Sequence, residues 1–368
     1  MKIFYDASAL CRNRTGIESV TYNLLLQLLA TDTRNEYHIV FRKHVNSEFL
    51  ALKSDRFRFY ISPFKSQILT EQIYIPWVVF KCRPDISAFI CFPPGLLIKK
   101  NIALYCHDAT NWRYKKYLSW KNRLYFKPLT GVAMKRAKMI LTNSLSSQSE
   151  ILKFFPRARN IIHVIYPALA RGFNVKNRTD ESSSNLLVKL GITKKYILCV
   201  GSLEPRKNIE FIIRSICAVL ERNDLQLVLA GRKAWGNNSI DVAINESHGR
   251  ARFVKTGYVS ESQLNTLYCC AEMFLYPSLY EGFGLPLLEA FSCGCPVITS
   301  NVSSMPEIAK DAALLINPTD KDELICSVES LLFDVKLRTE LKKRGARRVE
   351  IFSWENSAHK FINLIETT

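Results

Sequence analysis

The chain repeats one pattern from end to end: a short apolar run rich in β-branched and aromatic residues, a turn, and a longer amphipathic stretch. In the first half, the runs predicted as strands are KIFYDAS, EYHIVFR, ISAFICF, NIALYCHD, MILTNS and IIHVIYP. In the second half they are YILCVGS, LQLVLAG, RFVKTGYV, MFLYPS, PVITSN and ALLINP. Continuous apolar strands separated by helices indicate burial on both faces of a sheet. The pattern therefore predicts an α/β fold with parallel sheets.

One segment interrupts this pattern. Residues 171–190 are polar and serine-rich and have no apolar period, which is typical of a linker. We therefore expect one domain over residues 1–170 and a second over residues 191–350, each with a Rossmann-like sheet; a chain of 368 residues exceeds the usual size of one domain. Ligands bind such sheets at the carboxyl ends of the strands, so we predict a site in the cleft between two facing domains.

Positive charge is concentrated in the N-terminal half. Residues 1–180 hold 29 Lys and Arg against 11 Asp and Glu, whereas residues 181–368 hold 22 of each. Nine basic residues and no acidic one lie from 113 to 138, interleaved with Trp112, Tyr114, Tyr117, Trp120, Tyr125 and Phe126. This composition predicts that segment 112–138 contacts an anionic membrane surface, where each basic side chain adds on the order of 1 kcal/mol. A solvated basic face is the alternative; no nucleic-acid module surrounds the segment, so we expect no nucleic-acid partner.

Neither export nor a structural metal is indicated. No apolar run reaches the roughly 18 to 20 residues that span a bilayer, and Asp6 comes too early for a secretory signal, so we expect a cytoplasmic protein, free or attached to a membrane face. The eleven cysteines are scattered without a framework, which is typical of reduced thiols. Cys293 and Cys295 have no second Cys/His pair at zinc spacing, so we interpret them as packing residues.

The first chemically informative segment is YILCVGSLEPRKN. Its strand ends at Val200, Gly201 permits a tight turn, and Arg206 and Lys207 lie just before a helix that Asn208 can cap. Two cations beside a helix N-terminus form an anion site suited to a diphosphate. The same pair in isolation also fits an ordinary solvated loop.

The second segment is YEGFGLPLLEAFSCG, in which Glu281 precedes a helix and Glu289 lies about one turn inside it. Pro286 fits the first turn of that helix. Gly282 and Gly284 allow the loop backbone to approach a ligand and to offer N–H groups to oxygen atoms. Carboxylates accept hydrogen bonds from hydroxyl groups, so the two glutamates can bind different hydroxyls of one sugar-containing molecule. Each alone would be an ordinary loop or helix charge.

Strand ends in the N-terminal half supply further candidates. His107 and Asp108 end NIALYCHD, where a histidine can donate to a substrate oxygen or make a structural hydrogen bond. Gly16 precedes the first helix and either brings the backbone near a phosphate or acceptor or forms a plain turn. Asn143 and Ser144 follow MILT as helix caps or polar groups of the cleft.

The second half also contains GSLEPRKN, LAG, FVKTGYV and YPSLYEGFGLPLLEAFSCGCPVITSNVSSMPE in that order. This series resembles the retaining, nucleotide-sugar-dependent glycosyltransferases of the GT-B class, family 4, and the resemblance extends to the final SWENSAHKF segment. It implies that residues 1–170 serve the acceptor and membrane side and residues 191–350 bind the donor. Residues 351–368 would form a helix that crosses back to the first domain.

The resemblance implies a role for each candidate. Arg206 and Lys207 would hold the donor diphosphate, Glu289 would bind the ribose hydroxyls, and Glu281 and His107 would lie near the transferred sugar. Other donor contacts would come from Gly16, Gly201, Phe283, Gly284, Leu285, Tyr258 and Val259, and the acceptor side would be lined by Asp108, Asn143 and Ser144. The sequence departs from the family at Glu18, where a second glycine is common.

The implied reaction is hexosyl transfer with retention of configuration. LEPRKN is similar to the form found in mannosyl transfer from GDP-mannose to a polyprenyl-diphosphate-linked or oligosaccharide acceptor of O-antigen-like polysaccharides, at the inner face of the cytoplasmic membrane. Two cations can stabilise the leaving diphosphate, so no metal is expected. The only Asp-x-Asp, residues 320–322, opens a predicted helix, where acidic residues are common, so we do not interpret it as a metal site. The alternatives are a UDP-sugar donor, a sugar-nucleotide epimerase, and a basic membrane- or nucleic-acid-binding protein with a vestigial nucleotide site.

Overall fold

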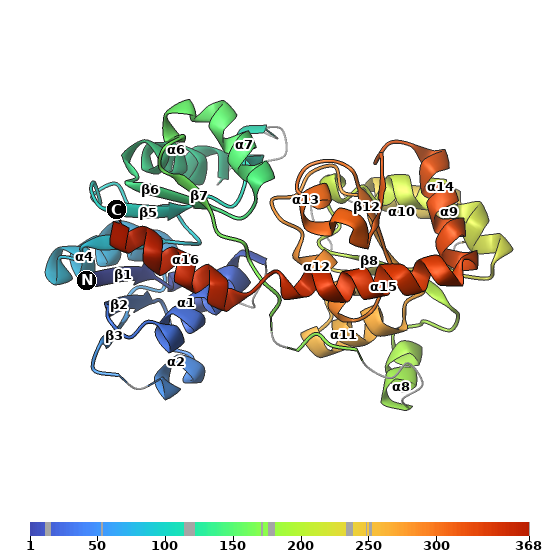
Figure 1. The fold of residues 1–368 in the computed structure, drawn as a ribbon, viewed down its shortest axis with the longest axis horizontal. Coiled ribbons are helices and arrows are strands. Elements are labelled where there is room, and N and C mark those ends of the chain that lie inside the picture. Colours follow the sequence, from blue (N-terminus) through green and yellow to red (C-terminus); the bar gives the residue numbers. More distant parts are fainter. Residues whose placement is uncertain are drawn as a thin grey trace. The chain divides into compact units, whose positions relative to one another are not determined.

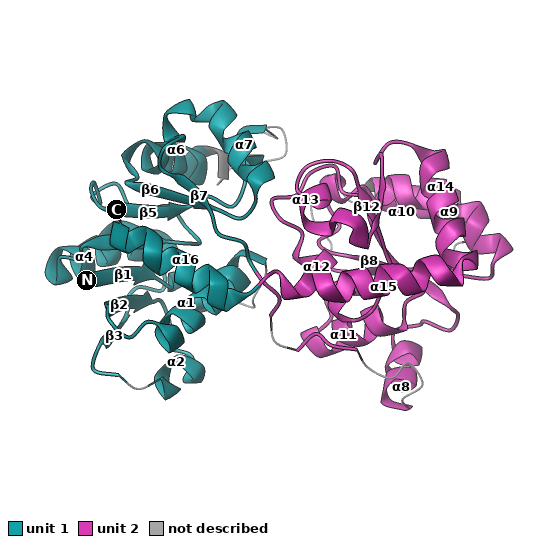
Figure 2. Ribbon diagram, viewed as in Figure 1, with its two compact units in different colours: residues 1–167, 353–368 teal, residues 168–352 magenta. Residues whose placement is uncertain are grey.

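The computed structural model describes residues 1–11, 16–52, 54–113, 122–170, 172–175, 181–232, 238–247, 249 and 252–367. The chain forms two compact units, one of residues 1–167 with 353–368 and one of residues 168–352 (Figure 2). Each unit contains one parallel β-sheet, which confirms the predicted α/β class. None of the described helices has the combination of length and apolar character needed to cross a bilayer.

The sheet of unit 1 has seven parallel strands in the order β3-β2-β1-β4-β5-β6-β7. Their bounds are β1 Lys2–Asp6, β2 Glu36–Phe41, β3 Phe57–Ile61, β4 Ile86–Phe89, β5 Ile102–Tyr105, β6 Met139–Thr142 and β7 Ile162–Val164. The sequence pattern missed β3. This edge strand has only exposed and half-buried side chains, and Arg58 interrupts its apolar residues, so it lacks the continuous apolar run of the central strands.

Helices cover both faces of this sheet (Figure 1). On one face Ile3 and Tyr5 pack with α1 (Gly16–Thr31) and α16 (Trp354–Thr367), which contact each other. On the other face Phe4 packs with α4 (Ile75–Cys82), α6 (Lys127–Arg136) and α7 (Leu145–Phe154), because successive strand residues point to opposite faces. The remaining helical segments are η1 Ser8–Cys11, α2 Ser47–Ala51, α3 Gln67–Leu69, η2 Thr70–Tyr74, α5 Thr110–Arg113, η4 Asn122–Phe126 and η5 Pro156–Ala158.

Unit 2 contains six parallel strands in the order β10-β9-β8-β11-β12-β13. Their bounds are β8 Tyr196–Val200, β9 Gln226–Ala230, β10 Phe253–Gly257, β11 Met273–Tyr276, β12 Val297–Ser300 and β13 Leu314–Ile316. All six were predicted. The described helical segments are α8 Glu181–Lys189, η6 Pro205–Lys207, α9 Ile209–Arg222, α10 Asn238–Glu246, α11 Glu261–Cys270, α12 Leu285–Ser292, α13 Met305–Ala309, η8 Lys310–Ala312, α14 Lys321–Phe333 and α15 Val335–Glu350.

Local sequence explains the helices that position the loops of unit 2. In α9 the residues Ile209, Ile212, Ile213, Ile216 and Leu220 recur at helical spacing and are buried against the sheet. Helix α8 lies inside the segment 171–190, where the apolar period is too weak to predict it from sequence.

Candidate active site

Two loops of unit 2 meet where the strand order of its sheet reverses. Strand β8 pairs with β9 on one side and with β11 on the other, so the chain leaves β8 and β11 toward the same edge but continues in opposite directions. Such a switch point leaves room for a ligand at the carboxyl ends of the strands. The loops that follow β8 and β11 carry Arg206, Lys207 and Glu281, so the predicted residues converge at this position.

Glycines bring the backbone close together at this edge. Gly201 and Gly231 have φ values of 131° and 156°, which side-chain-bearing residues rarely adopt. A Cβ added to Gly231 would lie 1.9 Å from the carbonyl oxygen of Gly201, and one added to Gly201 would lie 3.2 Å from Cε of Lys207. A side chain at position 201 would therefore crowd the lysine and strain the backbone.

Arg206, Lys207 and Glu281 form one charge cluster. Nζ of Lys207 donates to Oε1 of Glu281 at 2.6 Å, and Nη1 of Arg206 donates to Oε2 of the same carboxylate at 2.7 Å. Lys207 also donates to the hydroxyl of Tyr276 at 2.6 Å, while Nη2 of Arg206 is 2.7 Å from Oε1 of Glu204. The single carboxylate of Glu281 thus holds both cations in place.

Burial makes this cluster electrostatically strong. Lys207 and Glu281 are 8% and 7% exposed, whereas the side chain of Arg206 is 29% exposed. Burial alone would raise the pKa of Glu281, but the charges of Arg206 and Lys207 and their hydrogen bonds outweigh it and lower this pKa to about 2. Burial lowers the pKa of Lys207 and exceeds the opposing attraction of Glu281. The carboxylate is therefore more firmly ionised than the ammonium group.

Serine hydroxyls fix the glycine loop that carries Glu281. Oγ of Ser303 donates to the carbonyl of Glu281 at 2.6 Å and accepts from its N–H at 3.1 Å. Oγ of Ser304 lies 3.0 Å from the carbonyl of Glu281 and 2.9 Å from that of Phe283. Gly284 ends the loop at a φ of 107°, and a Cβ there would lie 2.6 Å from Cε of Met305. The loop before α13 therefore supports this backbone, a contribution that the sequence did not reveal.

Glu289 belongs to a separate environment on α12. It is half-buried, and its Oε2 accepts a hydrogen bond of 2.9 Å from the hydroxyl of Tyr268. Burial raises the pKa of Glu289 to about 7, although the hydrogen bond from Tyr268 acts in the opposite direction. The two glutamates of the motif therefore have opposite properties: Glu281 is a fixed anion, and Glu289 changes its charge near neutral pH.

Other predicted residues of unit 2 surround these groups. Phe283 is buried, and its ring packs edge-on against Phe352 at 5.5 Å, which leaves its backbone as the part of the residue lining the loop. Leu285 is the first residue of α12. Tyr258 follows β10, is 58% exposed, and lies beneath the guanidinium of Arg232 at 4.5 Å; the half-buried Val259 comes next.

The predicted capping role of Asn208 is wrong. Asn208 occupies the N-cap position of α9 with a φ of 62°, but its side chain does not cap the helix. Its Nδ2 donates instead to the carbonyls of Pro277 and Pro318 at 3.2 and 2.6 Å. Asn208 therefore ties together the loops after β8, β11 and β13, an arrangement that sequence spacing cannot show.

Three candidates of unit 1, His107, Asp108 and Ser144, make local hydrogen bonds. Nε2 of His107 donates to the carbonyl of Ile90 at 2.8 Å, and burial lowers the pKa of the imidazole. Asp108 accepts from the N–H of Thr110 at 2.8 Å, and Ser144 caps α7 by accepting from the N–H of Ser147 at 3.0 Å. Asn143 is buried, and its Oδ1 has no hydrogen-bond partner among the described residues.

Gly16 does not make a close approach within the described part of the chain. It begins α1, and a Cβ at this position would have no atom within 4 Å. Residues 12–15 lie outside the described residues. The described neighbours therefore place no steric demand for glycine at position 16.

Two buried carboxyl groups of unit 1 were missed by the sequence reading. Asp6 ends β1, burial raises its pKa to about 6, and its Oδ2 lacks a hydrogen-bond partner among the described residues. Glu71 accepts from Nε2 of Gln67 at 2.7 Å and from the hydroxyl of Tyr125 at 3.0 Å, and burial raises its pKa to about 7. The position of Asp6 at the end of the first predicted strand could have marked it as a candidate site residue.

The described aromatic residues of segment 112–138 face neighbouring groups of unit 1. Trp112 packs edge-on against Phe155 at 5.0 Å, and Phe126 stacks on Phe92 at 5.8 Å. The hydroxyl of Tyr125 binds Glu71. Tyr114, Tyr117 and Trp120 lie outside the described residues.

The acidic pair at 320 and 322 serves a helix terminus. Asp320 is the N-cap of α14 and accepts from the N–H of Glu323 at 3.0 Å. Across the parts of the chain that the structure describes, no three His, Cys, Asp or Glu side chains gather as a metal-binding group. Cys293 and Cys295 are buried, and Sγ of Cys293 donates to Oδ1 of Asn265 at 2.9 Å.

Comparison with known proteins places this geometry in context. The profile of the family described as "Glycosyl transferases group 1" matches residues 185–348. The "O-antigen chain mannosyltransferase B" of Escherichia coli is 32% identical over 260 residues, which cover 70% of this chain and 68% of that protein. The "Serotype-specific mannosyltransferase WbdA" of Escherichia coli is 31% identical over 259 residues, 69% of this chain, but the match spans only 32% of WbdA.

Among solved structures, the chain resembles that of WaaG, "a glycosyltransferase involved in lipopolysaccharide biosynthesis". The similarity has a TM-score of 0.71 at 14% sequence identity and covers 99% of each chain. At this identity the likeness concerns the fold, and it includes both units.

Proposed function

This chain belongs to the group 1 glycosyl transferases and has the GT-B fold, and from that premise we propose that it is a retaining hexosyltransferase that transfers mannose from GDP-mannose. The proposed acceptor is a hydroxyl of a polyprenyl-diphosphate-linked or free oligosaccharide in O-antigen-like polysaccharide synthesis. Support for mannose comes from the two Escherichia coli relatives, an O-antigen chain mannosyltransferase and a serotype-specific mannosyltransferase. The proposed location is the cytoplasmic face of the membrane.

One observation carries the proposal: the cluster of Arg206, Lys207 and Glu281 at the switch point of the second sheet. A buried ammonium group and a partly exposed guanidinium group lie side by side on one carboxylate. Arg206 retains enough exposure to reach a ligand, and its fork geometry suits two oxygen atoms of a diphosphate. Lys207 contributes a second, fixed positive charge.

These groups act on the departing nucleoside diphosphate. Cleavage of the sugar–phosphate bond places negative charge on the leaving diphosphate, and positioned cations stabilise that charge more in the transition state than in the ground state. We assign this role to Arg206 and Lys207. Glu281 positions both cations and lies near the transferred sugar. The acceptor hydroxyl attacks from the face that the diphosphate leaves, which retains the anomeric configuration. Its proton passes to the departing phosphate oxygen as the sugar–phosphate bond breaks.

The remaining roles concern binding. Glu289 binds the ribose hydroxyls in its ionised form, because a carboxylate accepts two hydroxyl hydrogen bonds. The backbone of Phe283, Gly284 and Leu285 contacts sugar or phosphate, Gly201 shapes the phosphate turn, and Tyr258 and Val259 lie beside the base. From unit 1 we assign His107 to the sugar, Gly16 to the phosphate or acceptor, and Asp108, Asn143 and Ser144 to the acceptor side.

Calorimetric titration with GDP and, separately, UDP tests the donor site without any acceptor. We expect GDP to bind wild-type protein, and Glu289→Ala to weaken that binding strongly. Glu221→Ala, which changes an exposed glutamate on α9, is the matched control and should bind GDP as the wild type does. Preference for UDP would remove the GDP-mannose proposal and retain hexosyl transfer. Binding of neither nucleotide by folded protein would contradict the assignment of the site.

Steady-state kinetics separate the two proposed roles. Arg206→Ala should lower kcat more than it raises the donor KM, because the guanidinium acts mainly on the leaving group. Glu289→Ala should have the reverse effect, because the ribose contact is the same in ground and transition states. Equal effects of both substitutions on the donor KM, with kcat unchanged, would refute this division.

A further inference from the structure

The helical run that leads into β4 is apolar on both of its faces. Segments α3, η2 and α4 follow one another directly, because Thr70 and Tyr74 at their junctions are in the right-handed helical conformation. Ile75 and Val78 of this run are buried in the core of unit 1. A helix at a protein surface normally places polar side chains on its outer face, so the outer face of this run is informative.

That outer face carries a stripe of large apolar side chains, which we call the α4 stripe: Leu69, Ile73, Trp77 and Phe80. They are 41%, 52%, 50% and 77% exposed, respectively, and they recur every three or four residues, so they project from one side of the run. Single exposed apolar residues are common, but a contiguous row marks an interaction surface.

A groove adjoins the α4 stripe. Its volume is about 810 Å³, and its lining includes the apolar side chains Trp77, Phe80 and Leu97 together with the basic side chains Arg83, Lys99 and Lys100. Leu97 is 70% exposed and enlarges the apolar area. The volume is in the range of pockets that take small amphipathic molecules.

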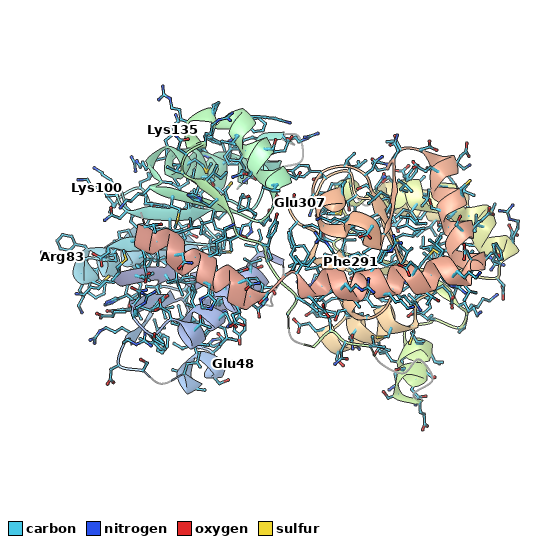
Figure 3. All side chains as sticks on the ribbon, viewed as in Figure 1. Glu48, Arg83, Lys100, Lys135, Phe291 and Glu307 are labelled. Carbon is cyan, nitrogen blue, oxygen red and sulfur yellow. The ribbon has the colours of Figure 1, made fainter. Side chains whose placement is uncertain are left out.

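The charges around the α4 stripe are mainly of one sign. Residues 62–101 contain five basic residues and two acidic ones. Of the acidic two, Glu71 is buried and Asp85 accepts a hydrogen bond from the backbone of Lys2. Nζ of Lys81 lies 5.1 Å above the Trp77 ring. Figure 3 shows Arg83 and Lys100 on the side of unit 1 where Figure 1 labels α4.

We propose that the α4 stripe and its adjoining groove dock on an anionic phospholipid bilayer. Trp77 and Phe80 enter the interfacial region, and Arg83, Lys99 and Lys100 contact the lipid phosphates. Aromatic side chains combined with cations suit this boundary, because the ring prefers the headgroup region and each cation is attracted by the negative surface potential. A protein partner of the same size would require carboxylates opposite these cations, whereas a bilayer supplies phosphates along the whole rim.

This proposal deepens the membrane location given under the proposed function and rests on it for its biological purpose. It differs in the residues that make contact. The described aromatic residues of segment 112–138 pack within unit 1, whereas the α4 stripe is exposed. Among the described residues, the contact is therefore assigned to residues 69–100; Tyr114, Tyr117 and Trp120 lie outside them.

Flotation with vesicles tests the proposal on the full-length protein. Wild-type protein should bind vesicles of phosphatidylcholine with phosphatidylglycerol, and salt should release it from them. It should bind vesicles of pure phosphatidylcholine at least about tenfold more weakly. The double substitution Trp77→Ser/Phe80→Ser should weaken binding to the anionic vesicles at least about tenfold. Phe333→Ser changes a phenylalanine of unit 2 that is 69% exposed, and it should bind as the wild type does.

Two further variants locate the charged contribution. Lys99→Glu/Lys100→Glu should weaken binding to anionic vesicles at least about tenfold, whereas Lys127→Glu/Lys135→Glu, within segment 112–138, should have a smaller effect. Loss of binding only in the second variant would overturn the assignment to the α4 stripe. Equal binding of the wild type and Trp77→Ser/Phe80→Ser would overturn it too. A third result would also overturn it: the wild type associates with itself, does not bind vesicles, and becomes monomeric in Trp77→Ser/Phe80→Ser. That result would make this face an interface between copies of the chain.

The same protein samples are titrated with GDP in solution. Retained GDP binding with no vesicle binding would overturn the docking proposal and leave the proposed donor site intact. Vesicle binding without nucleotide binding would contradict the donor site and support the docking surface. The two proposals therefore fail independently.

Discussion

The charge cluster of unit 2 predicts a large stability loss when its one shared carboxylate is neutralised. In Glu281→Gln the side chain keeps its size, but Arg206 and Lys207 lose the anion that each contacts within 2.7 Å. Folding lowers the pKa of Glu281 from 4.5 to about 2, which corresponds to about 3 kcal/mol of stability at pH 7. Breaking a buried ion pair costs about 3 to 5 kcal/mol in other proteins. Burial already lowers the pKa of Lys207, so proton loss from this lysine limits the effect.

Native-state hydrogen exchange of peptides from β8 and β11 measures the loss in unit 2 directly. The control is Glu204→Gln, the same chemical change at a carboxylate that is 17% exposed and pairs with Arg206 at 2.7 Å. We expect at most about 1 kcal/mol there. Because folding lowers the pKa of Glu281, its contribution is fully present above pH 4.5 and is lost as the pH falls toward 2. Equal losses in the two variants at pH 7 would refute the claim that Glu281 holds the cluster together.

Three further outcomes follow from the geometry. Gly231→Ala should destabilise unit 2 by more than about 1 kcal/mol in thermal unfolding, because its Cβ would overlap the Gly201 carbonyl. The control Gly131→Ala in α6, whose Cβ would have no atom within 4 Å, should leave the unfolding midpoint unchanged. Equal midpoints of the two variants would contradict this reasoning. Donor affinity should fall as the pH drops through about 7, because the carboxyl of Glu289 takes up a proton. Titrations at pH 6 and pH 8 should show this change in the wild type and not in Glu289→Gln. Equal wild-type affinity at both pH values would disprove the role of ionised Glu289. Tyr268→Phe removes a hydrogen bond that lowers the pKa of Glu289, so the midpoint of this pH dependence should rise. An unchanged midpoint would mean that the Tyr268 hydroxyl does not lower the pKa of Glu289.

The strand pattern alone placed three charged residues at one edge of a sheet, whereas their roles stay a prediction. Arg206, Lys207 and Glu281 were selected because each follows a predicted strand, and parallel strands of one sheet present their carboxyl ends at one edge. The structure brings their charged atoms within hydrogen-bond distance. The prediction required only the local strand pattern and the parallel arrangement that it implies.

The supporting residues were missed for a physical reason. Ser303 and Ser304 bind the backbone of the glycine loop, and Tyr268 binds Glu289 across 21 residues of sequence. Their local patterns are those of an ordinary turn and an ordinary helix. Asn208 carried a familiar capping signal, but the loops near it offered carbonyls that its side chain binds instead. Local propensity does not include such competing partners.

By itself the sequence determined the repeated strand and helix pattern, the α/β class and the chemical groups at the strand ends. These follow from hydrophobic periodicity and side-chain chemistry, which act over a few residues. Only the tertiary structure decided that the strand order reverses between β8 and β11, that the one carboxylate of Glu281 contacts both cations, and that the outer face of α4 is exposed. Each of these depends on contacts between distant segments, and an apolar helix residue has the same local pattern whether it lies in the core or at the surface.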